Sequence, residues 1–342
     1  MSARHAPILV WGAGAIGGTL GAFWARAGRD VLLVDVDTAH VEACRTTGLA
    51  VEGPVEPAFA EVVPAVTPDE LDGRFGRIVL AVKAHATPAA LDALAPHLAD
   101  DGLVLSAQNG LNERTIAERV GAERTVGAFV NFGADWLAPG RILYGNRGAV
   151  VVGELDGRVR ARTRELRELL ALFEPGAVLT EDVWGYLWGK LGYGAMLFAT
   201  ALTGESMSAN FSDPERAPVL IGLAREVGRV AEAEGVTPRG FDGYDAAAFA
   251  PGASEAAARA CIDALASFTA RTAKTHSGIH RDLAVRKRRT EVDPQVGTVV
   301  EIARGHGLEA PLLTRLVELI HDVEDGRRPL AGETFDELRR DA

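Results

Sequence analysis

Short runs of valine, isoleucine and leucine alternate with longer segments of helical spacing through the first half of the chain. This alternation is typical of parallel strands joined by crossover helices. It predicts strands over residues 7–11, 31–35, 77–82, 102–107 and 124–130. Two more apolar runs, 141–144 and 149–153, are separated by Gly-Asn-Arg-Gly and predict an antiparallel hairpin that extends the sheet.

Beyond Glu174-Pro175-Gly176 the strand pattern almost disappears, and helical spacing dominates. It predicts helices over residues 181–203, 213–235, 253–275, 281–306 and 310–324. A chain of 342 residues is also longer than one compact domain usually is. We therefore expect an α/β protein, with an N-terminal Rossmann-like, doubly wound sheet over residues 1–178 and a second, all-helical domain over residues 179–342.

A glycine cluster follows the first predicted strand and opens a helix. Gly12, Gly14 and Gly17 have the G-x-G-x-x-G spacing, and Asp35 ends the next predicted strand 18 residues after Gly17. In a dinucleotide-binding fold the first glycine permits the tight turn, the second lets the backbone approach a pyrophosphate, and the third allows close helix packing. The alternative is a purely structural strand-to-helix turn beside a solvated aspartate.

The first helical residues, Ala15 and Ile16, would then offer free backbone N–H groups to the phosphates. A carboxylate at Asp35 can accept hydrogen bonds from a ribose 2′-OH and would repel a 2′-phosphate. No lysine or arginine lies between Asp30 and Cys44 to bind that phosphate. We expect NAD as the cofactor, with NADP as the alternative.

The composition of the chain argues against several classes of protein. The net charge of −11 makes a nucleic acid a poor partner, and no apolar stretch is long enough to cross a membrane. Cys44 and Cys261 are the two cysteines, far apart, so neither a metal site nor a disulfide framework is expected. The first strand begins near residue 7, which leaves little room for a secretory leader, and we expect a cytoplasmic protein.

Polar residues follow two of the later predicted strands. Lys83 and Gln108-Asn109-Gly110 would lie at the carboxyl ends of strands, where ligands bind in a doubly wound sheet. Asn109 has two equally plausible roles, as a site residue or as the cap of the next helix. Lys190 lies among aromatic and apolar residues of a predicted helix. It is either a solvated charge or a partly desolvated lysine suited to general acid chemistry.

A basic run, Arg286-Lys287-Arg288-Arg289, precedes Glu291 in the predicted helix 281–306. The run would ordinarily be an exposed helix face. Glu291 alone could be no more than an ion-pair partner.

Together these motifs resemble the ketopantoate reductase family over nearly the whole chain. The resembling pieces are Gly12 to Gly17, Val82-Lys83, Gln108-Asn109-Gly110, Trp188-Gly189-Lys190-Leu191 and Thr290-Glu291-Val292-Asp293. The resemblance implies a Rossmann domain, a helical domain that tends to form a homodimer, and a site for a nicotinamide and a small 2-oxo or 2-hydroxy acid.

The resemblance also implies residue roles. Lys190 matches the lysine that donates a proton to the substrate carbonyl oxygen, and Glu291 matches the acidic residue that orients substrate and supports that lysine. Asn109 matches an asparagine lining nicotinamide and substrate, and Lys83 matches a lysine near the cofactor. Ser277 corresponds approximately to a serine that contacts the substrate carboxylate.

The chain departs from the family after the lysine. Where family members carry two asparagines, this sequence has Gly194 and Phe198. A pocket lined by Phe198, Met196 and Tyr193 would suit a more apolar substrate. Two alternatives therefore stand beside a ketopantoate reductase-like enzyme: an NAD-dependent dehydrogenase of an apolar hydroxy acid, and a catalytically silent dinucleotide-binding sensor.

Spacing adds a further expectation. Fourteen residues separate Ser277 from Glu291, or about 21 Å along a straight helix, so both can contact one small substrate only if the helix breaks. We expect the break around residues 286–289. Arg281 is an alternative to Ser277 as the carboxylate anchor.

Overall fold

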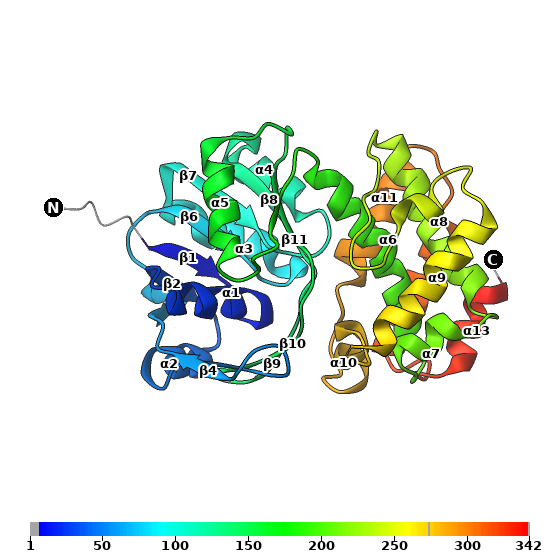
Figure 1. Ribbon diagram of the computed structural model, residues 1–342, viewed down its shortest axis with the longest axis horizontal. Coiled ribbons are helices and arrows are strands. Elements are labelled where there is room, and N and C mark those ends of the chain that lie inside the picture. The colour runs from blue at the N-terminus through cyan, green and yellow to red at the C-terminus, as the bar shows by residue number, and fades with distance from the viewer. Residues whose placement is uncertain (1–6, 273, 341–342) are drawn as a thin grey trace. The chain divides into compact units, whose positions relative to one another are not determined.

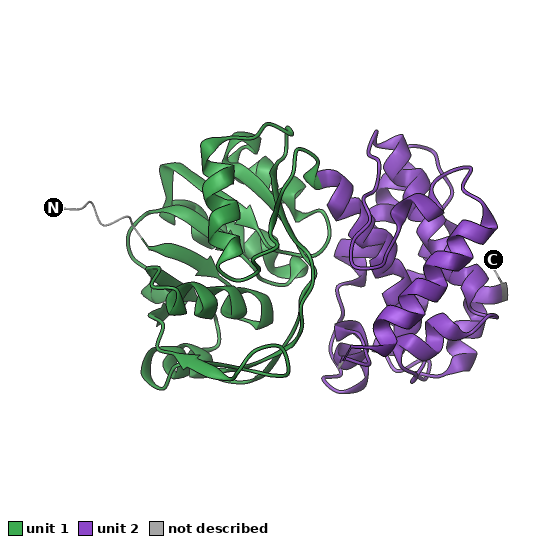
Figure 2. Ribbon diagram, viewed as in Figure 1, with its two compact units in different colours: residues 1–183 green, residues 184–342 purple. Residues whose placement is uncertain are grey.

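The computed structural model describes residues 7–272 and 274–340. It divides into two compact units, Met1–Val183 and Trp184–Ala342 (Figure 2). The first unit is α/β and the second is helical, which confirms the fold class predicted from the sequence. The division falls a few residues after the boundary predicted at 178/179.

An eight-stranded sheet forms the centre of the first unit (Figure 1). Its spatial order is β5 (Ala65–Val66), β2 (Val31–Val34), β1 (Ile8–Trp11), β6 (Phe75–Leu80), β7 (Leu98–Ser106), β8 (Thr125–Val130), β11 (Val150–Glu154) and β12 (Val178–Leu179). The strands from β5 to β8 are parallel, whereas β11 pairs antiparallel with β8. Since β2 follows β1 on one side and β6 lies on its other side, β1 is the switch point at which such sheets bind ligands.

Helices cover both faces of this sheet. Ile8 and Val10 belong to one core with α1 (Ala15–Arg26) and α5 (Ala161–Ala171). Leu9 and Trp11 alternate with them and belong to the other core, with α3 (Thr87–Leu94) and α4 (Asn112–Val120). A strand buried on both faces in this way reads as the continuous apolar run seen in the sequence. α2 (Thr38–Thr46) follows β2.

The predicted hairpin between residues 141–144 and 149–153 is wrong. β10 (Arg141–Asn146) belongs to a separate four-stranded sheet, in the order β4 (Phe59–Glu61), β3 (Leu49–Glu52), β10 and β9 (Gly133–Ala138), whereas β11 belongs to the main sheet. The reason is the sequence Pro139-Gly140, which turns β9 into β10 with Gly140 at φ +72°. Both edges of β10 are then occupied, and the chain after Asn146 passes on to the main sheet.

The second unit is built from helices. They are α6 (Val183–Ala201), α7 (Met207–Ser212), α8 (Ala217–Ala233), α9 (Glu255–Ala270), α10 (Gly278–Ala284), α11 (Thr298–Gly305), α12 (Pro311–Glu324) and α13 (Gly332–Arg340). A 3-10 turn occupies Ala246–Phe249 and a π-helical turn occupies Asp293–Gly297 in this unit. In the first unit, short 3-10 turns occupy Pro68–Glu70, Ala84–Ala86, Ala95–His97 and Ala122–Arg124.

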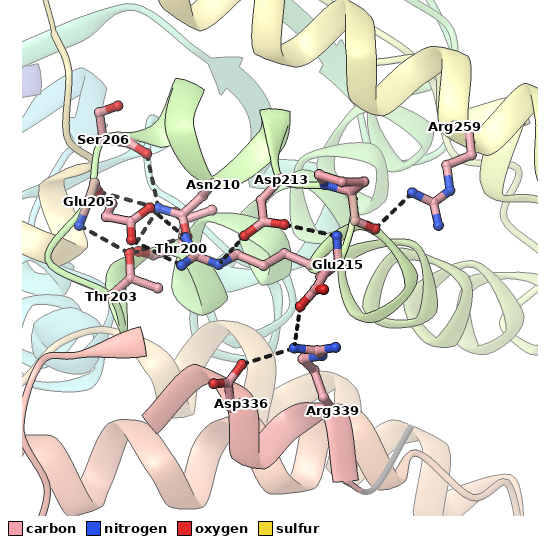
Figure 3. Close-up of polar contacts among 12 residues, drawn as sticks. Thr200, Thr203, Glu205, Ser206, Asn210, Asp213, Glu215, Arg259, Asp336 and Arg339 are labelled. Atoms are coloured by element: carbon pink, nitrogen blue, oxygen red, sulfur yellow. Dashed lines mark hydrogen bonds and ion pairs between the residues drawn. The ribbon is translucent and has the colours of Figure 1, made fainter. Parts of the chain in front are cut away.

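A polar network joins the loop after α6 to the start of α8 and to α13 (Figure 3). The Arg216 guanidinium donates to both Glu205 oxygens, at 2.8 and 3.0 Å, and to the Asn210 side-chain oxygen at 2.7 Å. Asn210 is fully buried and also donates to Thr203 at 2.9 Å. The hydrogen bonds from Arg216 lower the pKa of Glu205. Arg339 of α13 binds Glu215, so the last described helix is tied to the same region.

Candidate active site

The glycine loop after β1 is closely packed at two of its three motif glycines. Gly12 has φ +97°, and a Cβ there would lie 2.8 Å from the Val82 backbone nitrogen. A Cβ on Gly17 would lie 2.1 Å from the Gly12 carbonyl oxygen. A Cβ on Gly14 would meet no atom within 4 Å among the residues that the structure describes. The loop is therefore packed at its first and third glycines and open at the second.

The start of α1 faces this open position. Gly14 is the N-cap of α1, and no described side chain caps the helix or adds an acidic group to its first turn. Ala15 and Ile16 are half-buried there. Uncapped N–H groups at a helix N-terminus favour an anion, so the loop can hold a phosphate without displacing a protein partner.

Asp35 lies beside the loop, at the end of β2. One of its carboxylate oxygens accepts the Ala13 backbone N–H at 2.8 Å, and the other accepts the Asp37 N–H at 3.0 Å. A carboxylate has about four acceptor positions, so these two bonds leave capacity for ribose hydroxyls. The structure thus brings Asp35 together with the glycine motif.

His40 is a site residue that the sequence reasoning missed. Its ring is 1% exposed, with Nε2 2.8 Å from the Ala13 carbonyl oxygen and Nδ1 accepting the Gly140 N–H at 2.9 Å. These contacts require the proton on Nε2. His40 therefore ties the glycine loop to the turn between β9 and β10. Burial, then the nearby Asp35, raises the pKa of the adjacent Cys44 thiol to about 12, which keeps that thiol protonated.

The loops after β6 and β7 are joined by a chain of amide and hydroxyl groups. Gln108 Nε2 donates to the Val82 carbonyl oxygen and to the Thr87 hydroxyl, both at 2.8 Å. The Thr87 hydroxyl donates to Asn112 at 2.9 Å, and Asn112 donates back to the Asn109 carbonyl oxygen at 2.6 Å. Sequence reasoning found Gln108 and Asn109 and missed Thr87 and Asn112, which hold these loops in place.

Lys83 and Asn109 are displayed by those loops. Lys83 is exposed and begins the 3-10 turn Ala84–Ala86, and its neighbour Val82 contacts Gly12. Asn109 is half-buried. Because the cap position of α4 is Leu111 and no described side chain caps that helix, Asn109 does not have the capping role considered from the sequence.

In the second unit, α6 has two contrasting faces. Gly185, Gly189 and Gly192 form one face, and the loop 239–244 packs directly on it. The Gly185 carbonyl oxygen accepts the Arg239 N–H at 2.8 Å, and a Cβ on Gly189 would lie 2.0 Å from the Arg239 carbonyl oxygen. These close approaches explain the glycine-rich sequence of α6.

The other face carries Lys190. Helical spacing places Tyr186, Lys190, Gly194 and Leu197 in one stripe, and all four are half-buried. We call these four residues the Lys190 face. The lysine therefore lies at a half-buried position of α6, between Tyr186 one turn before it and Gly194 one turn after it.

The pocket lining predicted from the sequence is wrong for Met196 and Phe198. Both side chains are 0% exposed, because they point into the helical core. Tyr193 stacks on Phe211 and packs edge-on against Phe241. Burial, then Asp242, raises the pKa of Tyr193, so its phenol stays neutral. Gly194 and Leu197, by contrast, are half-buried.

Glu291 lies in the break of the helix predicted over 281–306. α10 ends at Ala284, and residues 285–291 are not helical, so the structure contains the expected break. The single predicted helix is wrong because its basic run folds back on α10: Arg286 and Arg288 both bind the buried Asp282 carboxylate, at 3.0 Å, and Lys287 adopts φ +48°.

Glu291 is buried, at 7% exposed, directly after Thr290. The segment that follows lies beside α6, since a Cβ on Gly194 would be 3.7 Å from Gln295 Oε1. Lys190 and Glu291 are thus carried by two neighbouring elements of one unit.

Ser277 is buried and is the N-cap of α10, where its hydroxyl accepts the His280 N–H at 3.2 Å. This gives Ser277 a structural function whether or not it contacts substrate. Burial, then His276 and Arg281, lowers the pKa of His280.

Within residues 7–272 and 274–340, no group of three or more His, Cys, Asp or Glu side chains is arranged to hold a metal ion. None of the helices described there combines the length and hydropathy needed to cross a membrane.

The family model for ketopantoate reductase PanE/ApbA matches residues 8–157, and the model for its C-terminal part matches residues 182–324. A 2-dehydropantoate 2-reductase from Mesorhizobium japonicum is 32% identical over 261 residues, which are 69% of this chain and 79% of the relative.

Two solved structures show the same fold. A D-mandelate dehydrogenase with NADH and anilino(oxo)acetate superposes with a TM-score of 0.82 at 21% identity, covering 94% of this chain and 99% of its own. A PanE/ApbA family ketopantoate reductase from Ralstonia eutropha JMP134 superposes with a TM-score of 0.77 at 25% identity, with the same coverage.

Proposed function

The chain belongs to the ketopantoate reductase family, and we propose that Lys190 is the general acid with which it converts a 2-oxo acid into a 2-hydroxy acid. The enzyme is an NAD(P)-dependent oxidoreductase that acts on CH–OH groups. The observation that carries the proposal is the Lys190 face, a half-buried stripe with one cation on an otherwise core-forming helix.

The first unit provides the features that a dinucleotide needs. The pyrophosphate would lie on the open Gly14 and the N–H groups of Ala15 and Ile16, between the closely packed Gly12 and Gly17. Lys83 and Asn109 would lie near the nicotinamide end, because they follow β6 and β7 at the same sheet edge. When bound, the cofactor supplies or accepts the hydride.

We propose NAD rather than NADP. Asp35 presents its carboxylate beside the loop, and Val36, 81% exposed, follows it in place of a basic residue. Arg45, the nearest later arginine, is paired with Glu42 and Glu70. Steady-state kinetics with both cofactors tests this, and a strong preference for NADPH would defeat it.

Lys190 would donate its proton to the carbonyl oxygen as the adjoining carbon is reduced, which removes the negative charge that develops there. Glu291, on the neighbouring segment, would favour the protonated lysine and orient the substrate. Asn109 would contact the substrate near the reacting carbon, and Ser277 is the proposed contact for its carboxylate.

The second candidate is a dehydrogenase of a more apolar 2-hydroxy acid. It is favoured by Gly194 and Leu197, which add no polar side chain to the part of the Lys190 face that follows the lysine. The structural likeness to D-mandelate dehydrogenase agrees with this candidate at the level of fold. The two candidates use the same residues, but the second reaction oxidises the hydroxy acid whereas the first reduces the oxo acid.

The test is turnover of NADH or NADPH with a panel of 2-oxo acids. Lys190→Ala is expected to lower kcat by on the order of 10²–10⁴-fold while the affinity for the cofactor stays unchanged. Lys287→Ala, which removes an exposed lysine of the same unit, is the control. Normal turnover by Lys190→Ala would disprove the assignment, and cofactor binding without turnover by the parent would favour the sensor.

We also propose that the chain is a homodimer in the cytoplasm. The dimer is the assembly implied by the family resemblance, and light scattering at several concentrations tests it. The cytoplasmic location stays a prediction from the sequence.

A further inference from the structure

Gly194 leaves an unfilled position on the Lys190 face. It lies one helical turn after Lys190, so a side chain there would project toward the lysine. A Cβ built on Gly194 would have one described atom within 4 Å, Gln295 Oε1 at 3.7 Å. Gly189 packs against the Arg239 backbone and Gly192 against the Tyr244 hydroxyl, whereas no such close neighbour among the described residues requires a glycine at position 194.

Gln295 approaches this position from the π-helical turn Asp293–Gly297. It follows Glu291 by four residues, just as Gly194 follows Lys190, and the two segments lie side by side. A π-helical turn adds a residue to the helical repeat and changes which side chains face a neighbour, and such turns are frequent at functional sites. Here the turn places a carboxamide beside the gap left by Gly194.

Gln295 is half-buried as a residue, and its carboxamide forms no hydrogen bond with another residue of 7–272 or 274–340. The other glutamine of the chain, Gln108, uses its amide nitrogen to bind both Val82 and Thr87. A carboxamide offers two donors and two acceptor positions, and those of Gln295 are open to a ligand, since neither atom is among the fully buried ones without a partner. A ligand bound at the Lys190 face would meet this carboxamide without breaking a hydrogen bond between described residues.

We infer that Gln295 is a specificity-determining residue that hydrogen-bonds a hydroxyl or other neutral oxygen on the side chain of the 2-oxo acid, in the space beside Gly194. The inference rests on the proposed function, because Lys190 fixes the position of the reacting carbonyl. One helical turn separates Lys190 from Gly194, about 5–6 Å between neighbouring side-chain positions. That distance suits a group a few bonds beyond the carbonyl, and a neutral amide suits a hydroxyl better than a carboxylate, which proteins usually bind with cations.

The test compares matched pairs of 2-oxo acids that differ in a single hydroxyl on the side chain. We expect Gln295→Leu to lower kcat/KM for the hydroxylated acid by about 10-fold, a typical loss for one hydrogen bond, and to leave the unsubstituted acid unchanged. Gln295→Glu, which keeps an acceptor of the same length, is expected to retain part of the preference. Thr298→Val, half-buried on the next turn, is the matched control.

A second variant tests the space itself. Gly194→Asn is expected to lower kcat/KM for acids with large side chains at least 10-fold more than for pyruvate, because the new side chain fills the gap. Thermal unfolding verifies that each variant is folded. The inference is overturned if a folded Gln295→Leu keeps the hydroxyl preference of the parent or loses both acids equally. Failure of the parent to turn over any 2-oxo acid overturns the proposed function as well, which distinguishes the two.

Discussion

Glu324 accepts two hydrogen bonds from Thr290, one from its backbone N–H at 2.7 Å and one from its hydroxyl at 2.8 Å. Both bonds go to the same carboxylate oxygen, while the other oxygen accepts Arg289 at 2.8 Å. The Glu324 side chain is 2% exposed at the end of α12. Since Thr290 immediately precedes Glu291, α12 fixes the backbone from which the proposed catalytic carboxylate projects.

This contact predicts a positioning role for Thr290. Thr290→Val removes the hydroxyl bond to Glu324 and the bond that the hydroxyl accepts from the Val292 N–H at 3.2 Å. We expect the free energy of unfolding to fall by about 1–2 kcal/mol and kcat to fall by about 10-fold, with KM for the cofactor unchanged. Thr290→Ser keeps the hydroxyl and should restore kcat. A stability loss without any change in kcat would show that Thr290 is structural only.

The geometry of the glycine loop predicts that a substitution at Gly14 weakens cofactor binding without changing the stability of the fold. Gly14→Ala adds a methyl group where no described atom lies within 4 Å, so its thermal midpoint should equal that of the parent. The methyl group would lie where a phosphate must approach, and we expect the cofactor Kd to rise at least 10-fold.

Gly12→Ala is the contrasting variant. It forces a Cβ to within 2.8 Å of the Val82 nitrogen at φ +97°, and the free energy of unfolding should fall by about 2 kcal/mol or more. Calorimetry and cofactor titration measure both quantities. Unchanged cofactor affinity in Gly14→Ala would mean that the loop does not hold the pyrophosphate.

Much of the fold could be predicted because the main sheet is buried on both faces. Its central strands read as continuous apolar runs, and Asp35 and the glycine motif stand at fixed offsets from them. The second sheet could not be predicted in the same way. β3, β4 and β9 are only partly buried, and the hydrophobic pattern alone does not say that β10 pairs with β9 rather than with β11.

The residues of the candidate site also differ in how far they could be predicted from the sequence. Lys190, Glu291 and Asn109 each belong to a short motif of consecutive residues, which can be recognised in the sequence. His40, Thr87, Asn112 and Glu324 are ordinary helix or helix-end residues when read locally, and their functions arise from partners up to 100 positions away. The helix ends after Ala284 because Arg286 and Arg288 of the basic run bind the buried Asp282 carboxylate, so that the run folds as a loop.

The contacts of His40 with the glycine loop predict that its substitution lowers the free energy of unfolding. His40→Leu leaves the Ala13 carbonyl and the Gly140 N–H without their partner in a buried place. Each unsatisfied group costs about 1–3 kcal/mol, so the free energy of unfolding should fall by at least about 2 kcal/mol. His97→Leu, which loses only an exposed bond to Gly73, should cost less. Equal losses in the two variants, measured by urea unfolding, would contradict the bridging role.

His280 predicts a pH dependence of stability. Its pKa in the folded protein is lowered from 6.5 by burial, then by His276, whose ring centroid lies 4.4 Å away, and by Arg281. The folded state therefore favours the neutral ring, and the unfolded chain binds more protons below about pH 6.5. The contribution to stability is complete above that pH and is lost as the pH falls through it toward the folded pKa. We expect the thermal midpoint to drop between pH 7.5 and pH 5.5, and His280→Gln, which cannot be protonated, to reduce the drop. His85→Gln, at an exposed position, should leave the drop as it is in the parent, and an equally large drop in both variants would refute the assignment to His280.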